Sequence, residues 1–177
     1  MAGGLPPVTL ILGGQRSGKS KLAETLIEDA AGGGLYLATA EARDGEMTDR
    51  IAAHRARRGP DWETIEEPLD ILGQIREHAA PGRPVLVDCV TLWLSNLMAA
   101  GRDPESEVAA LAQGLDGLGG PVVFVSNEVG LGVIPANALA RSFADAAGIA
   151  NQRLAQRADR VVFTAAGLPL VLKGHPL

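Results

Sequence analysis

An apolar run that ends in a glycine-rich loop constrains the fold of this chain more than any other feature. Residues 8–14 read VTLILGG, which is typical of a strand buried on both faces of a sheet. Residues 13–20 read GGQRSGKS, and an amphipathic helical pattern extends over 17–31. Because strand, G-x-x-x-x-G-K-S loop and helix come in this order, the sequence predicts an α/β fold that holds phosphate groups at the start of its first helix.

Strand and helix patterns alternate along most of the remaining chain. Strands are expected at 35–39, 84–91 and 121–130, and residues 160–173 read as two strands joined by a turn at Ala166-Gly167. Helices are expected at 46–58, 68–80, 92–101, 105–118 and 137–159. The alternation predicts an α/β, RecA-like P-loop NTPase fold in one domain over residues 1–177. Its sheet should be mostly parallel, with helices on both faces and an antiparallel edge hairpin at the C-terminal end.

Charge and cysteine content narrow the class of protein. The formal net charge is −5 and the sequence has no basic block, so nucleic acid is not an expected partner. No apolar run approaches the roughly 20 residues that span a bilayer, so the chain is not expected to be membrane-embedded. Cys89 is the only cysteine, and the first residues, MAGGLPP, have no export-signal pattern. A reducing, cytoplasmic location is therefore expected.

The loop at 13–20 has the chemistry needed to bind a nucleoside triphosphate. Glycines allow its backbone N–H groups to converge on phosphate oxygens, and the following helix adds its positive end. Lys19 can neutralise the β and γ phosphates, and Ser20 can bind Mg²⁺. A glycine-rich turn with a surface lysine is the alternative, and the strand and helix on either side argue against it. We expect the nucleotide to be bound by Gly13, Gly14, Gln15, Arg16, Ser17, Gly18, Lys19 and Ser20.

Asp88 ends the apolar run VLVD, which reads as a neighbouring strand. In nucleotide-binding folds of this kind, an acid at such a position holds Mg²⁺, often through water. A helix N-cap or a turn residue is the alternative, because acids are common at strand ends. With the phosphate loop present, we expect Asp88 to be a metal ligand together with Ser20. Cys89 reads as a small buried side chain without a chemical role.

His54 lies on the predicted helix over 46–58, on the same face as Met47, Ile51 and Arg58. The neighbouring arginines disfavour protonation, which leaves a neutral imidazole at neutral pH. Such an imidazole can attack phosphorus, and arginines can stabilise the charge that develops. From this pattern alone a solvated histidine is the simpler alternative. The chain's two other histidines read as structural or solvated.

Several longer segments carry a resemblance to one known family. Residues 126–155 read SNEVGLGVIPANALARSFADAAGIANQRLA, residues 44–58 read DGEMTDRIAAHRARR, and residues 87–97 read VDCVTLWLSNL. Together with GGQRSGKS, these segments resemble the bifunctional adenosylcobinamide kinase / adenosylcobinamide-phosphate guanylyltransferase family of cobalamin biosynthesis. The resemblance covers nearly the whole chain in order. The phosphate loop is shared by many families, whereas the NEVG stretch and the histidine helix are much more specific.

The resemblance implies two reactions at one site. The first phosphorylates adenosylcobinamide with ATP or GTP, and the second transfers GMP from GTP to adenosylcobinamide phosphate and releases pyrophosphate. It implies a GMP–histidine intermediate at His54, with Lys19 as the other catalytic residue and Mg²⁺ as cofactor. Members of the family are often trimers, so a homo-oligomer is expected. The implied guanine-nucleotide contacts are Gly13–Ser20, Ala38, Thr39, Ala40, Arg55, Ala56, Arg57, Arg58, Glu66 and Asp88.

Only the resemblance to this family assigns a role to Glu66. A carboxylate that accepts from the guanine N1–H and amino group would favour GTP, because adenine lacks that donor pair. Two positions depart from some relatives, which have a glutamate where Asp88 stands and a second histidine where Ala53 stands. The nucleophilic role therefore falls on His54 alone.

Two other functions remain open on the sequence. A P-loop small-molecule kinase would form no histidine adduct, and a nucleotide-binding switch or assembly module would need a macromolecular partner for turnover. Asn127 and Glu128 could order a substrate, a metal or only their own loop. The roles of Arg141 and Asn151 are equally open.

Overall fold

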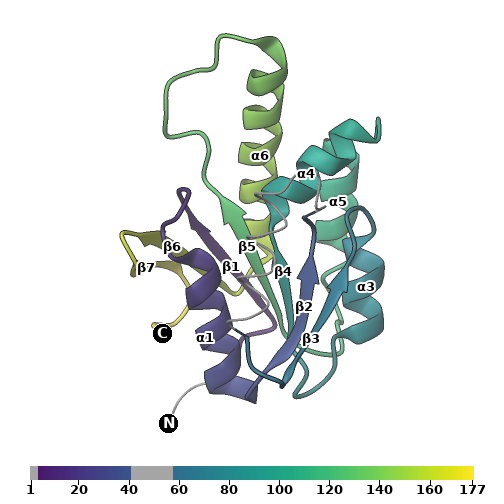
Figure 1. Ribbon diagram of the computed structural model, residues 1–177, viewed down its shortest axis with the longest axis vertical. Helices are drawn as coiled ribbons and strands as arrows, with labels where there is room; N and C mark the ends of the chain where they lie inside the picture. The colour runs from purple at the N-terminus through teal and green to yellow at the C-terminus, as the bar shows by residue number, and fades with distance from the viewer. Residues whose placement is uncertain (1–3, 41–57) are drawn as a thin grey trace.

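The protein forms an α/β structure around one seven-stranded sheet (Figure 1). The computed structural model describes residues 4–40 and 58–177, and every element below lies in those ranges. The strands are β1 (Val8–Gly13), β2 (Gly34–Ala38), β3 (Trp62–Glu66), β4 (Val85–Asp88), β5 (Val122–Asn127), β6 (Arg160–Ala165) and β7 (Leu168–Lys173).

The sheet has the order β3-β2-β4-β5-β1-β6-β7. All neighbouring strands from β3 to β6 run parallel, and β7 runs antiparallel to β6. The predicted P-loop fold class, with its mostly parallel sheet and C-terminal edge hairpin, is therefore confirmed. Parallel strands place their carboxyl ends at one edge, which brings the ends of β1, β4 and β5 together.

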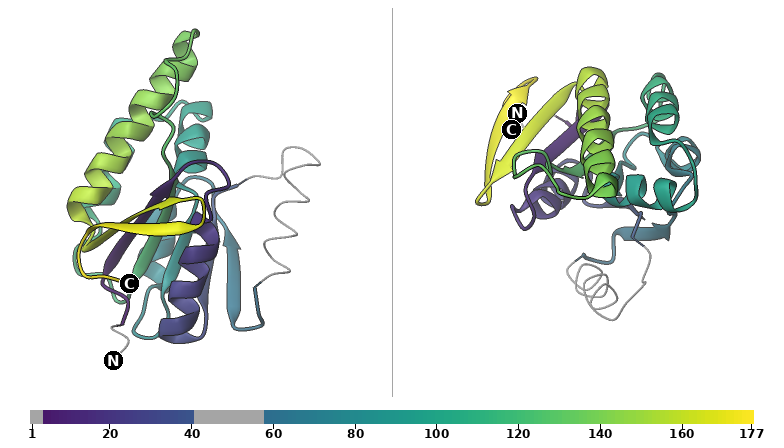
Figure 2. Two further views of the ribbon diagram at one scale, coloured as in Figure 1. Left: turned by 90° about the vertical axis from the view of Figure 1, so that its left-hand side faces the viewer. Right: turned by 90° about the horizontal axis from the view of Figure 1, so that it is seen from above.

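Helices cover both faces of the sheet (Figure 2). They are α1 (Lys19–Ala31), α3 (Ile71–His78), α4 (Val90–Ala99), α5 (Pro104–Gln113) and α6 (Ala138–Arg157). Helix α1 lies on one face, where Ala23 and Ile27 pack with Ile11 and Leu86. The other four helices lie on the opposite face and enclose the larger core around Phe124. This arrangement leaves the carboxyl-end edge of the sheet accessible between the layers.

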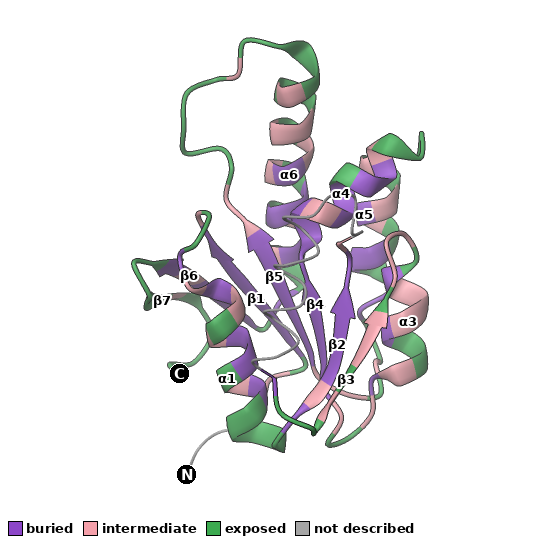
Figure 3. Cartoon of the chain, viewed as in Figure 1, coloured by how far each residue is buried: buried purple, intermediate pink, exposed green. Residues whose placement is uncertain are grey.

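The core is built from the central strands, whose residues are almost all buried (Figure 3). Strand β1 is buried along its whole length, as its continuous apolar run predicts. By contrast, the segment between β5 and α6 is mostly exposed, with Leu131, Val133 and Ile134 at 78%, 95% and 80% exposure. Within the described ranges, no helix is both long and apolar enough to cross a membrane.

Strand β3 was not among the predicted elements. In its sequence, WETIE, the two glutamates are exposed and the other three residues are half-buried, and among the described strands it pairs only with β2 at the edge of the sheet. The predicted strand over 84–91 was too long: β4 ends at Asp88 and α4 begins at Val90. The apolar residues after Asp88 are buried because α4 packs on the sheet, and an apolar run does not distinguish a buried helix from a strand.

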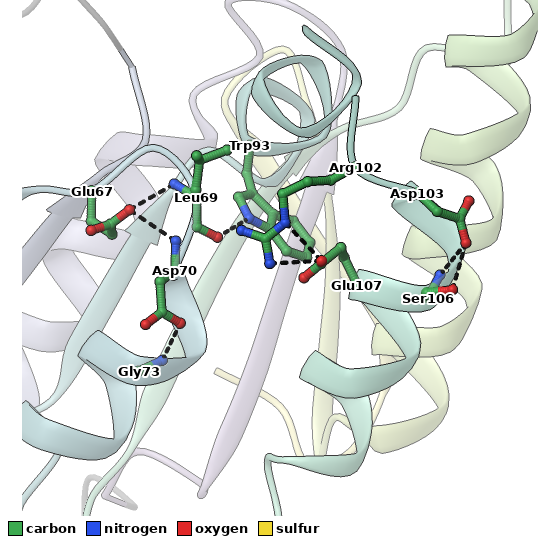
Figure 4. Close-up of polar contacts among 9 residues, drawn as sticks. All are labelled: Glu67, Leu69, Asp70, Gly73, Trp93, Arg102, Asp103, Ser106 and Glu107. Carbon is green, nitrogen blue, oxygen red and sulfur yellow. Dashed lines mark hydrogen bonds and ion pairs between the residues drawn. The ribbon is translucent and has the colours of Figure 1, made fainter. Parts of the chain in front are cut away.

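Aspartates start two of the helices that flank the sheet (Figure 4). The Asp70 carboxylate accepts from Gly73 N at 3.0 Å at the start of α3, and the Asp103 carboxylate accepts from Ser106 N at 3.0 Å at the start of α5. Each bond satisfies an N–H group that the helix itself leaves without an acceptor. Between them, Trp93 Nε1 donates to Leu69 O at 2.8 Å and ties α4 to the segment before α3.

Candidate active site

The phosphate loop begins where β1 ends. Gly13 has φ +153° and lies so close to β6 that an added Cβ would sit 2.3 Å from the Thr164 carbonyl oxygen. Gly18 has φ +98° and caps α1 in a left-handed conformation that glycine adopts without strain. On the other side, Gly167 N donates to Ser17 O at 2.9 Å, so the turn of the β6–β7 hairpin supports the loop.

Lys19 lies across this loop. Its Nζ donates to Gly14 O at 2.5 Å and to Ser17 Oγ at 3.4 Å, and the residue is only 6% exposed. Burial lowers the pKa of Lys19 below its ordinary value of 10.5, against the opposing effects of Cys89 and of the negative charge of Asp88. Phosphate oxygens bound in the loop would offer the amine a stronger, charged acceptor than the carbonyl.

Asp88 stands at the end of β4 and accepts from the Tyr36 hydroxyl at 2.6 Å through Oδ2. Burial and the negative charge of Asp88 raise the pKa of Tyr36 well above its ordinary range, so the phenol remains a donor. The Arg58 guanidinium carbon lies 3.4 Å from the centre of the Tyr36 ring, close enough for a cation–π contact. Arg58 Nη1 is 3.9 Å from Glu24 Oε1 on α1, and both side chains are buried.

A second set of polar contacts ties together the strand ends. The Thr39 hydroxyl donates to Cys89 O and accepts from Cys89 N, both at 2.8 Å. Asn127 Nδ2 donates to Thr91 Oγ1 at 2.8 Å, which joins β5 to α4. Burial raises the pKa of Cys89, followed by the effect of the Asp88 charge, so the thiol stays neutral. The absence of a chemical role for Cys89 stays a prediction.

A cavity of about 830 Å³ opens between the phosphate loop and these strand ends. It is lined by most of the predicted nucleotide-binding residues that the structure describes: Gln15, Arg16, Ser17, Gly18, Lys19, Ser20, Ala38, Ala40, Arg58 and Asp88. Gly13 and Gly14 form the start of the loop behind it. Residues 50 or more positions apart in the sequence therefore meet at one site.

Other predicted residues lie elsewhere. Thr39 is fully buried and holds β2 to Cys89, so its side chain has a structural contact within the described part of the chain. Glu66 ends the edge strand β3 opposite Ala38, is exposed, and is not among the residues that line the cavity. His54, Arg55, Ala56 and Arg57 lie outside the described residues.

Sequence reasoning missed several residues of the cavity wall. Tyr36, Lys21, Thr64, Leu92, Val125 and Val129 line it, and so does Cys89. Tyr36 carried a usable signal, because a single polar-tipped aromatic in an otherwise apolar strand needs a partner for its hydroxyl when buried. The others belong to helix and strand patterns whose direction toward the cavity depends on the tertiary fold.

The residues left open on the sequence have structural contacts. Glu128 Oε1 accepts from Gly130 N at 2.8 Å and so orders its own turn, although Glu128 also lines the cavity. Asn151 is buried on α6 and accepts from Ser126 Oγ at 2.7 Å. Arg141 Nη1 donates to Pro135 O at 3.0 Å and to Ala136 O at 2.7 Å, which holds the segment before α6.

The donor set fits Mg²⁺ bound mainly by phosphate oxygens and water. Asp88 and Ser20 both line the cavity. Among residues 4–40 and 58–177, three or more His, Cys, Asp or Glu side chains do not gather into a metal-binding group. One carboxylate and one hydroxyl beside a phosphate loop are a sufficient protein contribution for Mg²⁺, which keeps several waters and substrate phosphates as ligands.

Comparisons with known proteins agree with the sequence motifs. The chain is 52% identical over 171 residues to the bifunctional adenosylcobalamin biosynthesis protein CobP of Pseudomonas aeruginosa, a match that covers 95% of this chain and 98% of the relative. It is 40% identical to the bifunctional adenosylcobalamin biosynthesis protein CobU of Salmonella typhimurium, with coverage of 93% and 98%.

A solved structure supports the fold alone. The flagellar accessory protein FlaH of Methanocaldococcus jannaschii matches with a TM-score of 0.56 and 14% identity, over 98% of this chain and 82% of that chain. The sequence match is more specific, because the model of the cobinamide kinase / cobinamide phosphate guanyltransferase family matches residues 9–172. The chain thus belongs to the cobinamide kinase / cobinamide phosphate guanyltransferase family.

Proposed function

We propose that this chain phosphorylates adenosylcobinamide with ATP or GTP and then transfers GMP from GTP to the product. The observation that carries the proposal is the cavity that Lys19, Ser20 and Asp88 line together at the end of a glycine-rich loop. Family membership supplies the substrates, and the cavity brings together Lys19, Ser20 and Asp88, which would hold the nucleotide phosphates in both reactions.

The kinase step requires positioning and charge neutralisation. The acceptor hydroxyl oxygen attacks the γ phosphorus, the bond from that phosphorus to the bridging oxygen breaks, and the hydroxyl proton is released. The loop N–H groups and Lys19 stabilise the charge on the phosphate oxygens. Ser20 and Asp88 would hold Mg²⁺, which would supply further positive charge to stabilise the phosphate oxygens.

The guanylyl step uses the same phosphate loop, but the reaction takes place at the α phosphate. A nitrogen of His54 attacks the α phosphorus of GTP, and pyrophosphate leaves while the loop and Lys19 hold it. The phosphate of adenosylcobinamide phosphate then attacks this phosphorus, which gives adenosylcobinamide-GDP and frees the histidine. Arg58, whose buried Nε has no hydrogen-bond acceptor among the described residues, would be available to a phosphate oxygen.

Glu66 is proposed as the residue that selects guanine. It ends β3 next to the end of β2, where Ala38 lines the cavity. A carboxylate in this position can accept from guanine N1–H and the amino group, and adenine offers no such donor pair. Replacing Glu66 with Gln should therefore reduce the preference for GTP in the second reaction more than it changes the rate with ATP in the first.

We further propose that the enzyme is a cytoplasmic homo-oligomer, with a trimer as the expected state. Leu168, Leu170 and Leu172 of β7 are 73%, 60% and 58% exposed, which is an unusual apolar face for an edge strand. Light scattering of the purified protein at several concentrations measures its mass directly. A monomer at all concentrations would contradict the proposed assembly.

Mass spectrometry after incubation with GTP and Mg²⁺ tests the proposed function most directly. The expected result is a GMP-sized, acid-labile adduct on the peptide that contains His54. It should be absent from His54→Ala and present in His78→Ala, a matched histidine change in the last turn of α3.

The kinase reaction provides the second half of the test. His54→Ala should still phosphorylate adenosylcobinamide with ATP, because the phosphate loop is unchanged. An adduct that persists in His54→Ala would reject His54 as the nucleophile. Turnover of adenosylcobinamide without any adduct would support a P-loop kinase that lacks the transferase reaction.

A further inference from the structure

Tyr36 connects two charged residues at the cavity without being a predicted part of either reaction. It lies on β2, is 6% exposed, and directs its hydroxyl to Asp88 on the neighbouring strand β4. The register pairs Tyr36 with Leu86 and Ala38 with Asp88, so the phenol reaches two residue pairs further along the strands to meet the carboxylate. This diagonal contact fixes the rotation of the Asp88 carboxylate, because one oxygen is held at 2.6 Å.

The ring of Tyr36 is itself held in place. Arg58 stacks over its face at 3.4 Å, donates to Thr64 Oγ1 at 3.4 Å, and has its Nη1 3.9 Å from Glu24 Oε1. Arg58 is 8% exposed and Glu24 is 5% exposed, so these contacts are protected from water. A cation over the ring also draws electron density from the phenol and strengthens its O–H donor.

We propose that Tyr36 is a positioning residue for the metal-dependent steps, which orients the Asp88 carboxylate toward the magnesium nucleotide while Arg58 fixes the Tyr36 ring. The inference rests on the proposed function for the role of Asp88. It goes further, because it assigns a distinct task to Tyr36 that acts through the Asp88 carboxylate. Tyr36, Asp88 and Arg58 all line the cavity, so a change at any of them is felt at the nucleotide site.

Tyr36→Phe tests the proposal with little disturbance, since it removes one oxygen and keeps the ring under Arg58. GTP affinity is measured over a range of Mg²⁺ concentrations. The Mg²⁺ concentration at which half of the Mg²⁺-dependent gain in affinity is reached should rise roughly tenfold in the variant, because the loss of a hydrogen bond to a charged group usually has an effect of this size. GTP affinity in EDTA should change less than twofold. Equal Mg²⁺ midpoints with and without Tyr36→Phe, or equal losses of GTP affinity with and without Mg²⁺, would overturn the proposal.

Ser126→Ala is the matched control. It also removes one buried hydroxyl with a short bond, 2.7 Å to Asn151 Oδ1, but Ser126 does not line the cavity. Both variants should lower the melting temperature, and only Tyr36→Phe should shift the Mg²⁺ midpoint. A shift of the same size in Ser126→Ala would mean that the effect is general destabilisation and would reject the assignment.

A second measurement needs no substitution of Tyr36. Tyr36 is the only tyrosine in the chain, so growth on 3-fluorotyrosine places one ¹⁹F nucleus beside this hydroxyl. Adding Mg²⁺ to the GTP-bound protein should move the ¹⁹F resonance. An unmoved resonance while GTP affinity rises would contradict the proposal. Both experiments are made on the His54→Ala chain, which should bind GTP and Mg²⁺ without forming the GMP adduct, and neither uses adenosylcobinamide. Failure to phosphorylate adenosylcobinamide would therefore reject the proposed function and leave this test intact.

Discussion

Lys19 is a cation that the fold holds almost completely out of water. Its amine binds the Gly14 carbonyl and the Ser17 hydroxyl within the loop, and burial lowers its pKa. A buried ammonium costs stability unless charged partners compensate. The phosphates of a nucleotide provide such partners. Lys19 therefore favours nucleotide binding and lowers the stability of the nucleotide-free protein.

Replacing Lys19 with Met should therefore separate activity from stability. Phosphoryl transfer to adenosylcobinamide should fall by roughly a hundredfold or more, because one preorganised charge at the transferred phosphate is lost. The melting temperature should stay equal or rise, since the buried charge is gone. Lys173→Met on β7 is the matched control and should keep the wild-type rate; a Lys19→Met rate within threefold of wild type would contradict the role of Lys19.

Gly13 and Gly14 offer a test of the loop backbone. A Cβ on Gly13 would meet the Thr164 carbonyl oxygen at 2.3 Å in a strained φ region, whereas a Cβ on Gly14 meets nothing within 4 Å. Gly13→Ala should reduce the free energy of unfolding by about 2 kcal/mol or more, and Gly14→Ala by less than about 0.5 kcal/mol. Urea unfolding measures both; equal effects would show that the loop does not need glycine at position 13.

The site residues that could be predicted from the sequence belong to short continuous motifs. Gly13–Ser20 form a local motif, and Asp88 ends an apolar strand, so their places follow from the sequence pattern. The Tyr36–Asp88 contact joins residues that are 52 positions apart and depends on which strand lies beside which. The buried position of Thr39 depends on the same pairing, because its hydroxyl binds Cys89 across β2 and β4.

At the scale of elements, the start of a helix is decided by a few side chains. Asp103 accepts from both the amide and the hydroxyl of Ser106, and these hydrogen bonds hold its pKa below the ordinary 3.8. A depressed carboxyl pKa adds stability above the unfolded pKa. That contribution disappears as the pH falls through the folded value.

Asp103→Ala should accordingly lower the melting temperature at neutral pH, and the difference from wild type should shrink as the pH falls below 3.8. Thermal unfolding between neutral and acid pH measures this difference. Asp103→Asn is the matched comparison, since it keeps a capping oxygen and should show little pH dependence of its own. A difference that grows in acid would contradict the sign of the pKa shift.

Strand β3 shows why some elements escape sequence reasoning. Long apolar strands such as β1 are recognised because both faces are buried, but β3 is an edge strand with Glu63 and Glu66 exposed. Its five residues gain their extended conformation from pairing with β2. A sequence pattern predicts a strand whose own residues have a strand-like pattern of apolar side chains. It misses a strand whose extended conformation depends on pairing with a neighbouring strand.

At the scale of the whole molecule, stability depends on the core that the central strands share. Phe124 on β5 is fully buried in the larger core, whereas Leu131, in the segment between β5 and α6, is 78% exposed. Phe124→Ala should reduce the free energy of unfolding by about 3–5 kcal/mol, and Leu131→Ala by less than about 1 kcal/mol. Denaturant titration of the two variants measures the contrast; a larger loss at Leu131 than at Phe124 would contradict the dependence of stability on the shared core.

The place of β1 in the sheet has a consequence for how the protein is made. Its two neighbouring strands, β5 and β6, are formed by residues 122–127 and 160–165, which follow β1 much later in the sequence. A ribosome therefore releases the phosphate loop long before the strands that hold it in shape exist. Pairing across such distances is slow and leaves apolar strand edges open in the meantime. Nucleotide can stabilise this enzyme only after its last strands are complete, so newly made chains depend on their own collapse, or on chaperones, until then.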